Sequence, residues 1–150
     1  MNRILDIPFT TMDGTTTSLR DLGGSQWLVV NVASACGATP QYEALQHLHA
    51  THENLTVVGF PCNQFGAQEP GTHAEICEFT ANKYGVKFPL MAKVEVNGTE
   101  ATPLYQALTK VTDADGHSGD IRWNFEKFFV AQDGSVSRFS TRVQPDEISF

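Results

Sequence analysis

A buried-strand pattern that ends at a cysteine is the strongest constraint on how this chain can fold. Residues 27–33 are apolar and rich in valine except for Asn31, and the run has the length of a strand covered on both faces. Gly37 gives the backbone freedom to turn, and Pro40 suits the first turn of a helix. Apolar side chains recur at helical spacing after it. The pattern predicts a strand, a turn, and a helix over residues 39–52.

Cys36 falls between the predicted strand and the predicted helix. Backbone N–H groups and the macrodipole at a helix N-terminus favour a thiolate over a thiol, and only the thiolate is a nucleophile. The alternative is that Cys36 is a small buried hydrophobe, which is the usual role of a free cysteine. The strand, cysteine, turn and helix context favours the reactive interpretation.

A second buried strand follows at residues 55–60 and is stopped by Pro61. Strand, helix and strand in succession predict a βαβ unit with parallel strands and a right-handed crossover. The loop over residues 61–71 comes directly after the carboxyl end of the second strand, where open α/β sheets build their sites. This loop is therefore a candidate part of the functional site.

The other segments complete a mixed sheet flanked by helices. Thr72 and Glu75 form a capping box that opens a helix over residues 73–84, and Gly85 ends it. Further predicted elements are a hairpin (7–11 and 15–19), an extended segment (88–96), a helix (103–111), a closing hairpin (128–131 and 136–139) and the start of a helix (144–150). The order predicts an α/β, thioredoxin-like fold in which residues 1–150 form one domain.

Net charge and cysteine content argue against some classes of function and favour others. A net charge of −7 argues against a nucleic-acid or anionic-membrane surface. The N-terminus has no apolar segment typical of a signal peptide, and three cysteines is an odd, small number. We therefore expect a cytoplasmic protein with reduced thiols, at least one of them available for redox or catalytic work.

Neutral hydrogen-bond donors that could serve such a thiolate stand in the 61–71 loop and before the closing hairpin. The loop contains Asn63, Gln64 and Gln68, and Trp123 and Asn124 precede the hairpin. A thiolate, and the oxygen that leaves a peroxide, are both stabilised by such donors already in place. The alternative is that Trp123 is a core aromatic and Asn124 a turn or strand-end residue.

Four motifs in the same order, at residues 31–39, 59–65, 68–71 and 123–128, resemble those of the glutathione peroxidase family. The resemblance implies a thioredoxin-like fold and a catalytic tetrad of Cys36, Gln68, Trp123 and Asn124. It implies a peroxidase of the cysteine type, in which Cys36 becomes a sulfenic acid and no metal or organic cofactor is needed. Thr39 stands at the fourth position of what would be a Cys-x-x-Cys motif, which disfavours simple dithiol exchange.

The family resemblance leaves the recycling step open. Thioredoxin-dependent members carry a resolving cysteine near Thr80 or Ala81, whereas this chain has Cys77 about one helical turn earlier. We expect Cys77 to resolve the sulfenic acid with thioredoxin as reductant, after local unwinding of its helix. Cys62 is expected to be structural.

Two other expectations follow from the resemblance. The segment between Val111 and Trp123 is short, which favours a monomer, or at most a small dimer, with an open site. No basic pocket for glutathione is evident, because the scattered cations are each interpreted as solvated charges: Lys83, Lys87, Lys93, Arg122 and Lys127. The alternatives are a redox sensor that oxidises a partner protein and a one-cysteine peroxidase recycled by glutathione.

Overall fold

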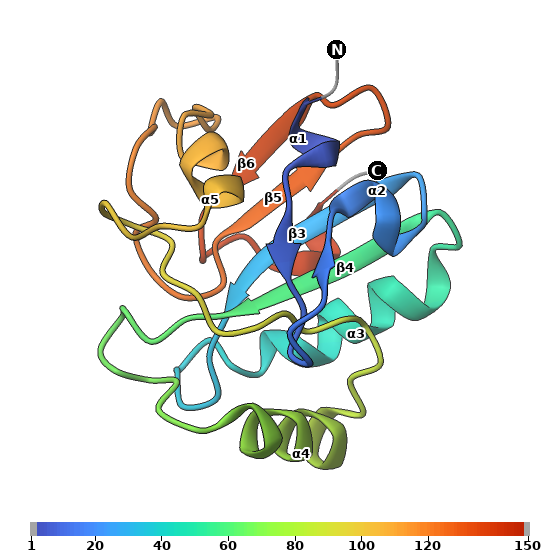
Figure 1. The fold of residues 1–150 in the computed structure, drawn as a ribbon, viewed down its shortest axis with the longest axis vertical. Coiled ribbons are helices and arrows are strands. Elements are labelled where there is room, and N and C mark those ends of the chain that lie inside the picture. Colours follow the sequence, from blue (N-terminus) through green and yellow to red (C-terminus); the bar gives the residue numbers. More distant parts are fainter. Residues whose placement is uncertain (1–2, 149–150) are drawn as a thin grey trace.

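The computed structural model describes residues 3–148 and has a four-stranded mixed sheet at its centre (Figure 1). The strand order is β4 (Leu55–Pro61), β3 (Gln26–Val32), β5 (Lys127–Val130) and β6 (Val136–Phe139). β3 is parallel to β4, while β3 with β5 and β5 with β6 are antiparallel. The predicted βαβ unit and the closing hairpin are both confirmed.

Helices cover both faces of this sheet (Figure 1). α3 (Gln41–Thr51) connects β3 to β4 and buries its apolar stripe against one face, with α4 (His73–Tyr84) beside it. α5 (Pro103–Leu108) packs into the apolar cluster on the other face. None of the helices within residues 3–148 is long and apolar enough to cross a membrane.

The N-terminal region differs in part from the prediction. β1 (Phe9–Thr10) and β2 (Thr16–Thr17) form the expected antiparallel hairpin, but β2 ends before Leu19. Ser18 accepts a hydrogen bond from the backbone N–H of Asp21 and caps α2 (Leu19–Leu22), a short helix that was not predicted. A second short helix, α1 (Arg3–Asp6), was also not predicted.

Helix boundaries were predicted well where a cap marks them. α4 begins after the Thr72–Glu75 capping box and ends at Gly85, which has a φ of 61°. α5 ends three residues before the predicted boundary, where the N–H groups of Lys110 and Val111 bond three residues back rather than four. The carbonyls of Thr109 and Val111 accept hydrogen bonds from Arg138 instead. The predicted tail helix is a single 3₁₀ turn, η1 (Pro145–Glu147), and residues 149–150 lie outside the described part.

The predicted extended segment over residues 88–96 forms no regular strand. It makes isolated bridges instead, with Leu90 opposite Gly59 and Met91 opposite Thr11. Pro89 accepts a hydrogen bond from the N–H of Gly59, so the segment lies along the free edge of β4.

Candidate active site

Three segments that are far apart in sequence meet at one edge of the sheet. β3 and β4 are parallel, so their carboxyl ends lie together (Figure 1). The loops that follow these two strands carry Cys36 and Gln68. β5 runs antiparallel to β3, so the turn before β5 comes to the same edge and brings Trp123 and Asn124. The fold therefore gathers the four residues of the predicted tetrad.

Cys36 lies in a series of turns between β3 and α3, and only 8% of its surface is exposed. Its N–H donates to Thr39 Oγ1 (2.9 Å), and that hydroxyl donates to the Ala33 carbonyl (2.8 Å). The N–H of Ala38 donates to Cys36 Sγ at 3.3 Å. The sulfur of Cys36 therefore has one backbone donor in place.

The turn differs from the prediction in two respects. α3 begins at Gln41, two residues later than expected, because the preceding N–H groups bond three residues back rather than four. Gly37 has no positive φ, and a Cβ there would meet no atom within 4 Å. The expectation that Gly37 is needed for backbone freedom is therefore wrong, and the glycine leaves open space beside Cys36.

Gln68 and Asn124 are joined by a hydrogen bond. Asn124 is fully buried, and its Nδ2 donates to Gln68 Oε1 at 3.0 Å. The Gln68 carbonyl accepts the N–H of Ala35 at 3.0 Å, which places Gln68 directly beside the Cys36 turn. Because its side-chain oxygen is engaged by Asn124, the amide nitrogen of Gln68 is the group left to donate toward a ligand.

Trp123 lies at the surface rather than in the core, with 38% of the residue exposed. Its ring packs against Phe65, with 5.7 Å between centroids. It also lies close to Gly66, where a Cβ would come within 3.3 Å of the indole. Within residues 3–148 the indole N–H has no hydrogen-bond partner, so it is free to donate to a ligand.

Cys36 and Trp123 open onto one cavity of about 500 Å³. Its other lining residues are Gly37, Ala38, Pro40, Gln41, Ala44, Thr141, Arg142 and Gln144. Arg142 is exposed at this cavity and is the one charged side chain among its lining residues. The cavity therefore offers a sulfur, neutral donors and a single positive charge.

Asn31, which interrupts the apolar run over residues 27–33 that includes most of β3, supports the turn that carries Trp123. Its Nδ2 donates to the Trp123 carbonyl (3.0 Å), and its own carbonyl accepts the N–H of Phe125 (2.6 Å). Phe125 has a φ of 63°, which is unusual for a bulky side chain. The polar interruption of an apolar strand was the signal that could have pointed to this role.

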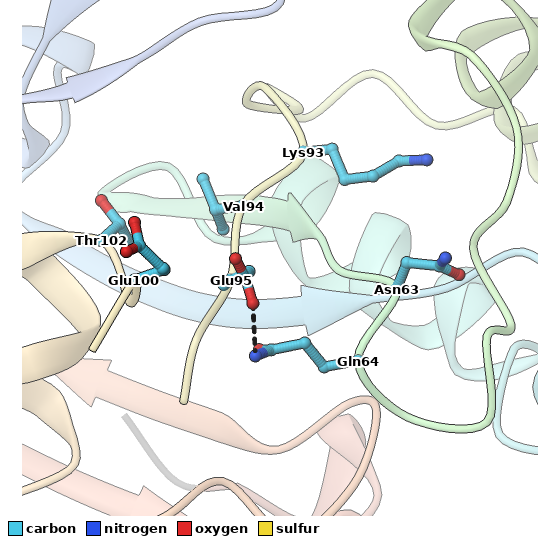
Figure 2. A pocket seen from close by; sticks show the side chains of 7 residues that line it. All are labelled: Asn63, Gln64, Lys93, Val94, Glu95, Glu100 and Thr102. Carbon is cyan, nitrogen blue, oxygen red and sulfur yellow. Dashed lines mark hydrogen bonds between the residues drawn. The ribbon is translucent and has the colours of Figure 1, made fainter. Parts of the chain in front are cut away.

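The loop that carries Gln68 is also held by hydrogen bonds from Asn63 and Lys93. Asn63 Oδ1 accepts the N–H of Glu69 (2.8 Å), and Lys93 Nζ donates to the carbonyls of Glu69 and Gly71 (2.7 Å each). Figure 2 shows Asn63, Gln64 and Lys93 around a second hollow, where Gln64 bonds to Glu95. No cysteine lines this hollow, and its contacts serve to hold the loop in place.

Glu69 is a buried group that sequence reasoning did not single out. Its side chain is fully buried, and Oε1 accepts the N–H of Ser34 at 3.1 Å. Burial raises the pKa of this carboxyl. Glu69 thereby links the Gln68 loop to the segment that leads into Cys36.

The other two cysteines lie in different environments, and all three cysteines are free thiols. Cys62 is buried, its S–H donates to Gln64 Oε1 at 3.5 Å, and burial raises the pKa of its thiol. These features fit the expected structural role. Cys77 is exposed on α4, where its sulfur lies 3.2 Å from Met12 Sδ.

The expected solvation of the scattered cations is wrong for Lys127 and for the half-buried Lys93, whose Nζ donates to two backbone carbonyls. Lys127 is fully buried beneath α3, whereas Lys83 and Lys87 are exposed as expected. Arg122 is partly exposed, but its guanidinium pairs with Asp113 (2.7 Å) and Glu126 (3.1 Å). The prediction failed because the sequence around a lysine does not show which backbone carbonyls of the folded chain will surround its amine.

Comparison with known proteins agrees with this geometry. The sequence model of the family described as glutathione peroxidase matches residues 4–109. The chain belongs to the glutathione peroxidase family. It is a peroxidase, an oxidoreductase that reduces hydroperoxides.

Relatives and solved structures cover nearly the whole peroxidase. It is 46% identical to the hydroperoxy fatty acid reductase gpx1 of Synechocystis, over 99% of this chain and 92% of that protein. It is also 46% identical to the glutathione peroxidase-like peroxiredoxin HYR1 of Saccharomyces cerevisiae, over 85% and 80%. The structure of T. cruzi GPX1 aligns with a TM-score of 0.75 at 30% identity, over 96% of this chain and 90% of that one.

The fold prediction is confirmed by a more distant structure. A thioredoxin-like protein from Aeropyrum pernix aligns with a TM-score of 0.67 over 93% of this chain and 83% of that one, at 17% identity. This peroxidase therefore has the predicted α/β, thioredoxin-like fold.

Proposed function

We propose that Cys36 is the nucleophile of this peroxidase and that its substrates are hydrogen peroxide and organic hydroperoxides. The Cys36 thiolate attacks one peroxide oxygen, an S–O bond forms and the O–O bond breaks. Sulfur is oxidised to a sulfenic acid, and the departing oxygen takes up a proton and leaves as water or an alcohol. The observation that carries this proposal is the N–H of Ala38 on Cys36 Sγ at the edge of an open cavity.

Gln68, Trp123 and Asn124 complete the proposed site. The indole N–H of Trp123 and the amide of Gln68 are uncharged donors beside the turn that carries Cys36. Asn124 orients Gln68 through its hydrogen bond. Such donors stabilise both the thiolate and the developing charge on the leaving oxygen without repelling either. No step of this mechanism draws on a metal ion or an organic cofactor.

Replacing Trp123 with phenylalanine tests the role of the indole N–H. We expect the rate constant for oxidation of Cys36 by hydrogen peroxide to fall about ten- to a thousandfold, as when one oxyanion donor is removed. Stopped-flow measurement of the first turnover gives this constant. Trp27→Phe is the matched control, because the Trp27 indole donates to the Gly23 carbonyl (3.0 Å) outside the cavity. Equal rates for Trp123→Phe and the control would contradict the assigned role.

For recycling, we propose reduction by thioredoxin through a disulfide between Cys36 and Cys77. Cys77 is exposed, as attack by a partner thiol requires, and it lies on α4 beside α3. A disulfide needs the two Cα atoms within about 6 Å of each other, so this step includes local unwinding of α4. The fungal relative at 46% identity is described as a peroxiredoxin, which supports a thiol-based cycle.

One equivalent of hydrogen peroxide, followed by thiol counting and peptide mass mapping, tests the recycling route. We expect a Cys36–Cys77 disulfide that is absent from the Cys77→Ser variant. A lasting sulfenic acid on Cys36 with Cys77 still free would support a one-cysteine peroxidase recycled by glutathione. A slow cycle that traps a mixed disulfide with another protein would support the redox sensor. An untouched Cys36 would overturn the proposed nucleophile.

Finer features of the proposal come from the cavity and the relatives. The Synechocystis relative is described as a hydroperoxy fatty acid reductase, and Arg142 places a positive charge at the cavity where a substrate carboxylate could bind. Fatty acid hydroperoxides are therefore proposed substrates. We also propose one domain over residues 1–150, a monomer, and a cytoplasmic location.

A further inference from the structure

Lys127 is buried without a counter-ion. It points from β5 to the face of the sheet that α3 covers, where its register partners are Val30 of β3 and Phe139 of β6. The residue is fully buried, and within residues 3–148 no carboxylate lies in salt-bridge contact with its ammonium. Burial of an unpaired charge is costly unless hydrogen bonds compensate for it. Hydrogen-bond acceptors must therefore surround the Lys127 ammonium.

Four neutral oxygens surround the Lys127 ammonium. Nζ donates to Gln41 Oε1 (2.9 Å) and to the Phe125 carbonyl (2.5 Å). It lies 3.4 Å from each of the carbonyls of Ser140 and Thr141. One amine thus joins the start of α3, the turn before β5 and the end of β6.

These contacts form part of a connected network beneath the Cys36 cavity. Gln41 Nε2 donates to the Thr141 carbonyl at 2.9 Å, and Thr141 Oγ1 donates to the Asn124 carbonyl at 2.7 Å. Gln41 and Thr141 also line the cavity that contains Cys36. The network therefore ends on the backbone of a residue in the proposed tetrad.

Phe125 is the point at which Lys127 acts on the site. Its φ of 63° is sparsely populated for a bulky residue and persists only where surrounding contacts hold it. The Phe125 N–H is bound to Asn31, and its carbonyl is bound to Lys127. The conformation of Phe125 sets the direction in which the preceding Trp123 and Asn124 project.

We propose that Lys127 is a positioning residue of this peroxidase, whose ammonium holds the Phe125 carbonyl and thereby sets Trp123 and Asn124 against Cys36. Lys127 is not among the residues that line the cavity, so it acts through the turn. This inference rests on the proposed roles of Trp123 and Asn124 and goes beyond them.

The protonation state of Lys127 then matters for activity. An ammonium has three N–H donors for its four acceptors, whereas a neutral amine has two and turns a lone pair toward a carbonyl. Burial lowers the pKa of Lys127 to about 7, and the negative charges of Glu126 and Glu147 act in the opposite direction. As pH rises through neutrality, the turn loses a donor that holds it.

The other titratable groups packed near Lys127 include two carboxylates, Tyr42 and His47. Tyr42 is buried against Phe125, and burial raises the pKa of its hydroxyl well above the ordinary value. Glu126 bonds to Arg122 and Arg138, and Glu147 of η1 accepts the N–H of Gln144. β3 carries no titratable side chain, and no histidine lines the Cys36 cavity. On α3, His47 lines a neighbouring hollow together with Pro40 and Ala44.

The unmodified protein provides the first test. Loss of the free Cys36 thiol is followed by peptide mapping between pH 6 and 8.5, with hydrogen peroxide in one series and iodoacetamide in the other. Iodoacetamide reports thiolate formation alone, whereas the peroxide reaction also needs the positioned donors. We expect the ratio of the peroxide to the iodoacetamide rate constant to fall about tenfold across this range, because misplaced donors slow only the peroxide reaction.

Variants separate positioning from general stability. Lys127→Met should lower the peroxide rate constant at pH 6.5 about ten- to a hundredfold and make the ratio independent of pH. His47→Gln should keep the pH dependence of the ratio. If Lys127 had a purely structural role, Lys127→Met would lower the unfolding midpoint. The ratio of the peroxide to the iodoacetamide rate constant would then depend on pH in the folded variant as it does in the unmodified protein.

The outcomes distinguish this inference from the proposed function. A ratio that is constant with pH in the unmodified protein would overturn the role of Lys127, whether or not Lys127→Met folds. A Cys36 that peroxide leaves unoxidised at every pH would instead overturn the proposed nucleophile. Loss of the pH dependence in His47→Gln would assign it to that histidine and also overturn the inference.

Discussion

Replacing Cys36 with serine is expected to lower the peroxidase rate at least about a thousandfold, since removal of a catalytic nucleophile is among the largest single effects in enzymes. A serine hydroxyl is not ionised at neutral pH, even with the N–H of Ala38 pointing at it. Serine also has no counterpart of the sulfenic acid, so the O–O bond has no acceptor for its oxygen. Steady-state turnover of hydrogen peroxide with a thiol reductant measures the loss.

Two control variants make the Cys36→Ser result specific. Cys62→Ala removes a buried thiol outside the cavity, so its rate per folded molecule should match the unmodified protein. Comparing Cys36→Ser with the double variant Cys36→Ser, Cys77→Ser measures any background reaction of the exposed Cys77 thiol. Activity of Cys36→Ser within a few-fold of the unmodified protein would show that another thiol reduces the peroxide.

Replacing Arg138 with methionine is expected to cost about 3–5 kcal/mol of unfolding free energy, the usual penalty for breaking a buried ion pair. Arg138 is almost fully buried, and its Nε donates to Glu126 Oε2 at 2.5 Å. Its remaining N–H groups donate to the four carbonyls of Thr109, Val111, Gly119 and Asp120. The variant would leave these oxygens and part of the Glu126 carboxylate without donors.

Urea unfolding measures this loss, provided that the m-value is unchanged. Arg20→Met is the matched control, because Arg20 forms a comparable 2.7 Å pair with Asp6 on the surface. Solvent screens that pair, so the control midpoint should hardly move. Equal shifts for the two variants would show that the buried guanidinium contributes no more than the exposed one.

Arg138 also connects stability to the proposed site. The carbonyls that it binds lie in the segment between α5 and the turn that carries Trp123. Arg122, directly before Trp123, is tied to Glu126, the carboxylate that Arg138 binds. The charged network on one face of β5 and Lys127 on the other therefore hold the same turn from two sides.

Elements with local signals were predicted closely. The Thr72–Glu75 box caps α4, and the Asp133–Gly134 turn closes the hairpin of β5 and β6, because the interactions that form them span only a few residues. The start of α3 and the end of α5 were misplaced by a few residues, because the backbone N–H groups there bond three residues back rather than four. The short α2 was missed although its Ser18 cap is itself a local interaction.

For the site, sequence alone determined which residue types are present and on which element each lies. Cys36 after a buried strand and the donors Gln68, Trp123 and Asn124 were all found from pattern and family resemblance, and the fold brings them to one edge. Their catalytic roles stay predictions. The exposure of Trp123 and the Asn124–Gln68 bond required the tertiary structure, since these residues lie on separate loops.

Only the tertiary structure decided what the charged residues do. Lys127 stands in the sequence as an ordinary cation between strand residues, and charged side chains are mostly solvated. Its burial follows from β5 lying between β3 and β6 beneath α3, which places Gln41 and the Phe125 carbonyl around its amine. Pairing between residues distant in sequence is a property of the folded chain, and the support of the proposed site depends on it.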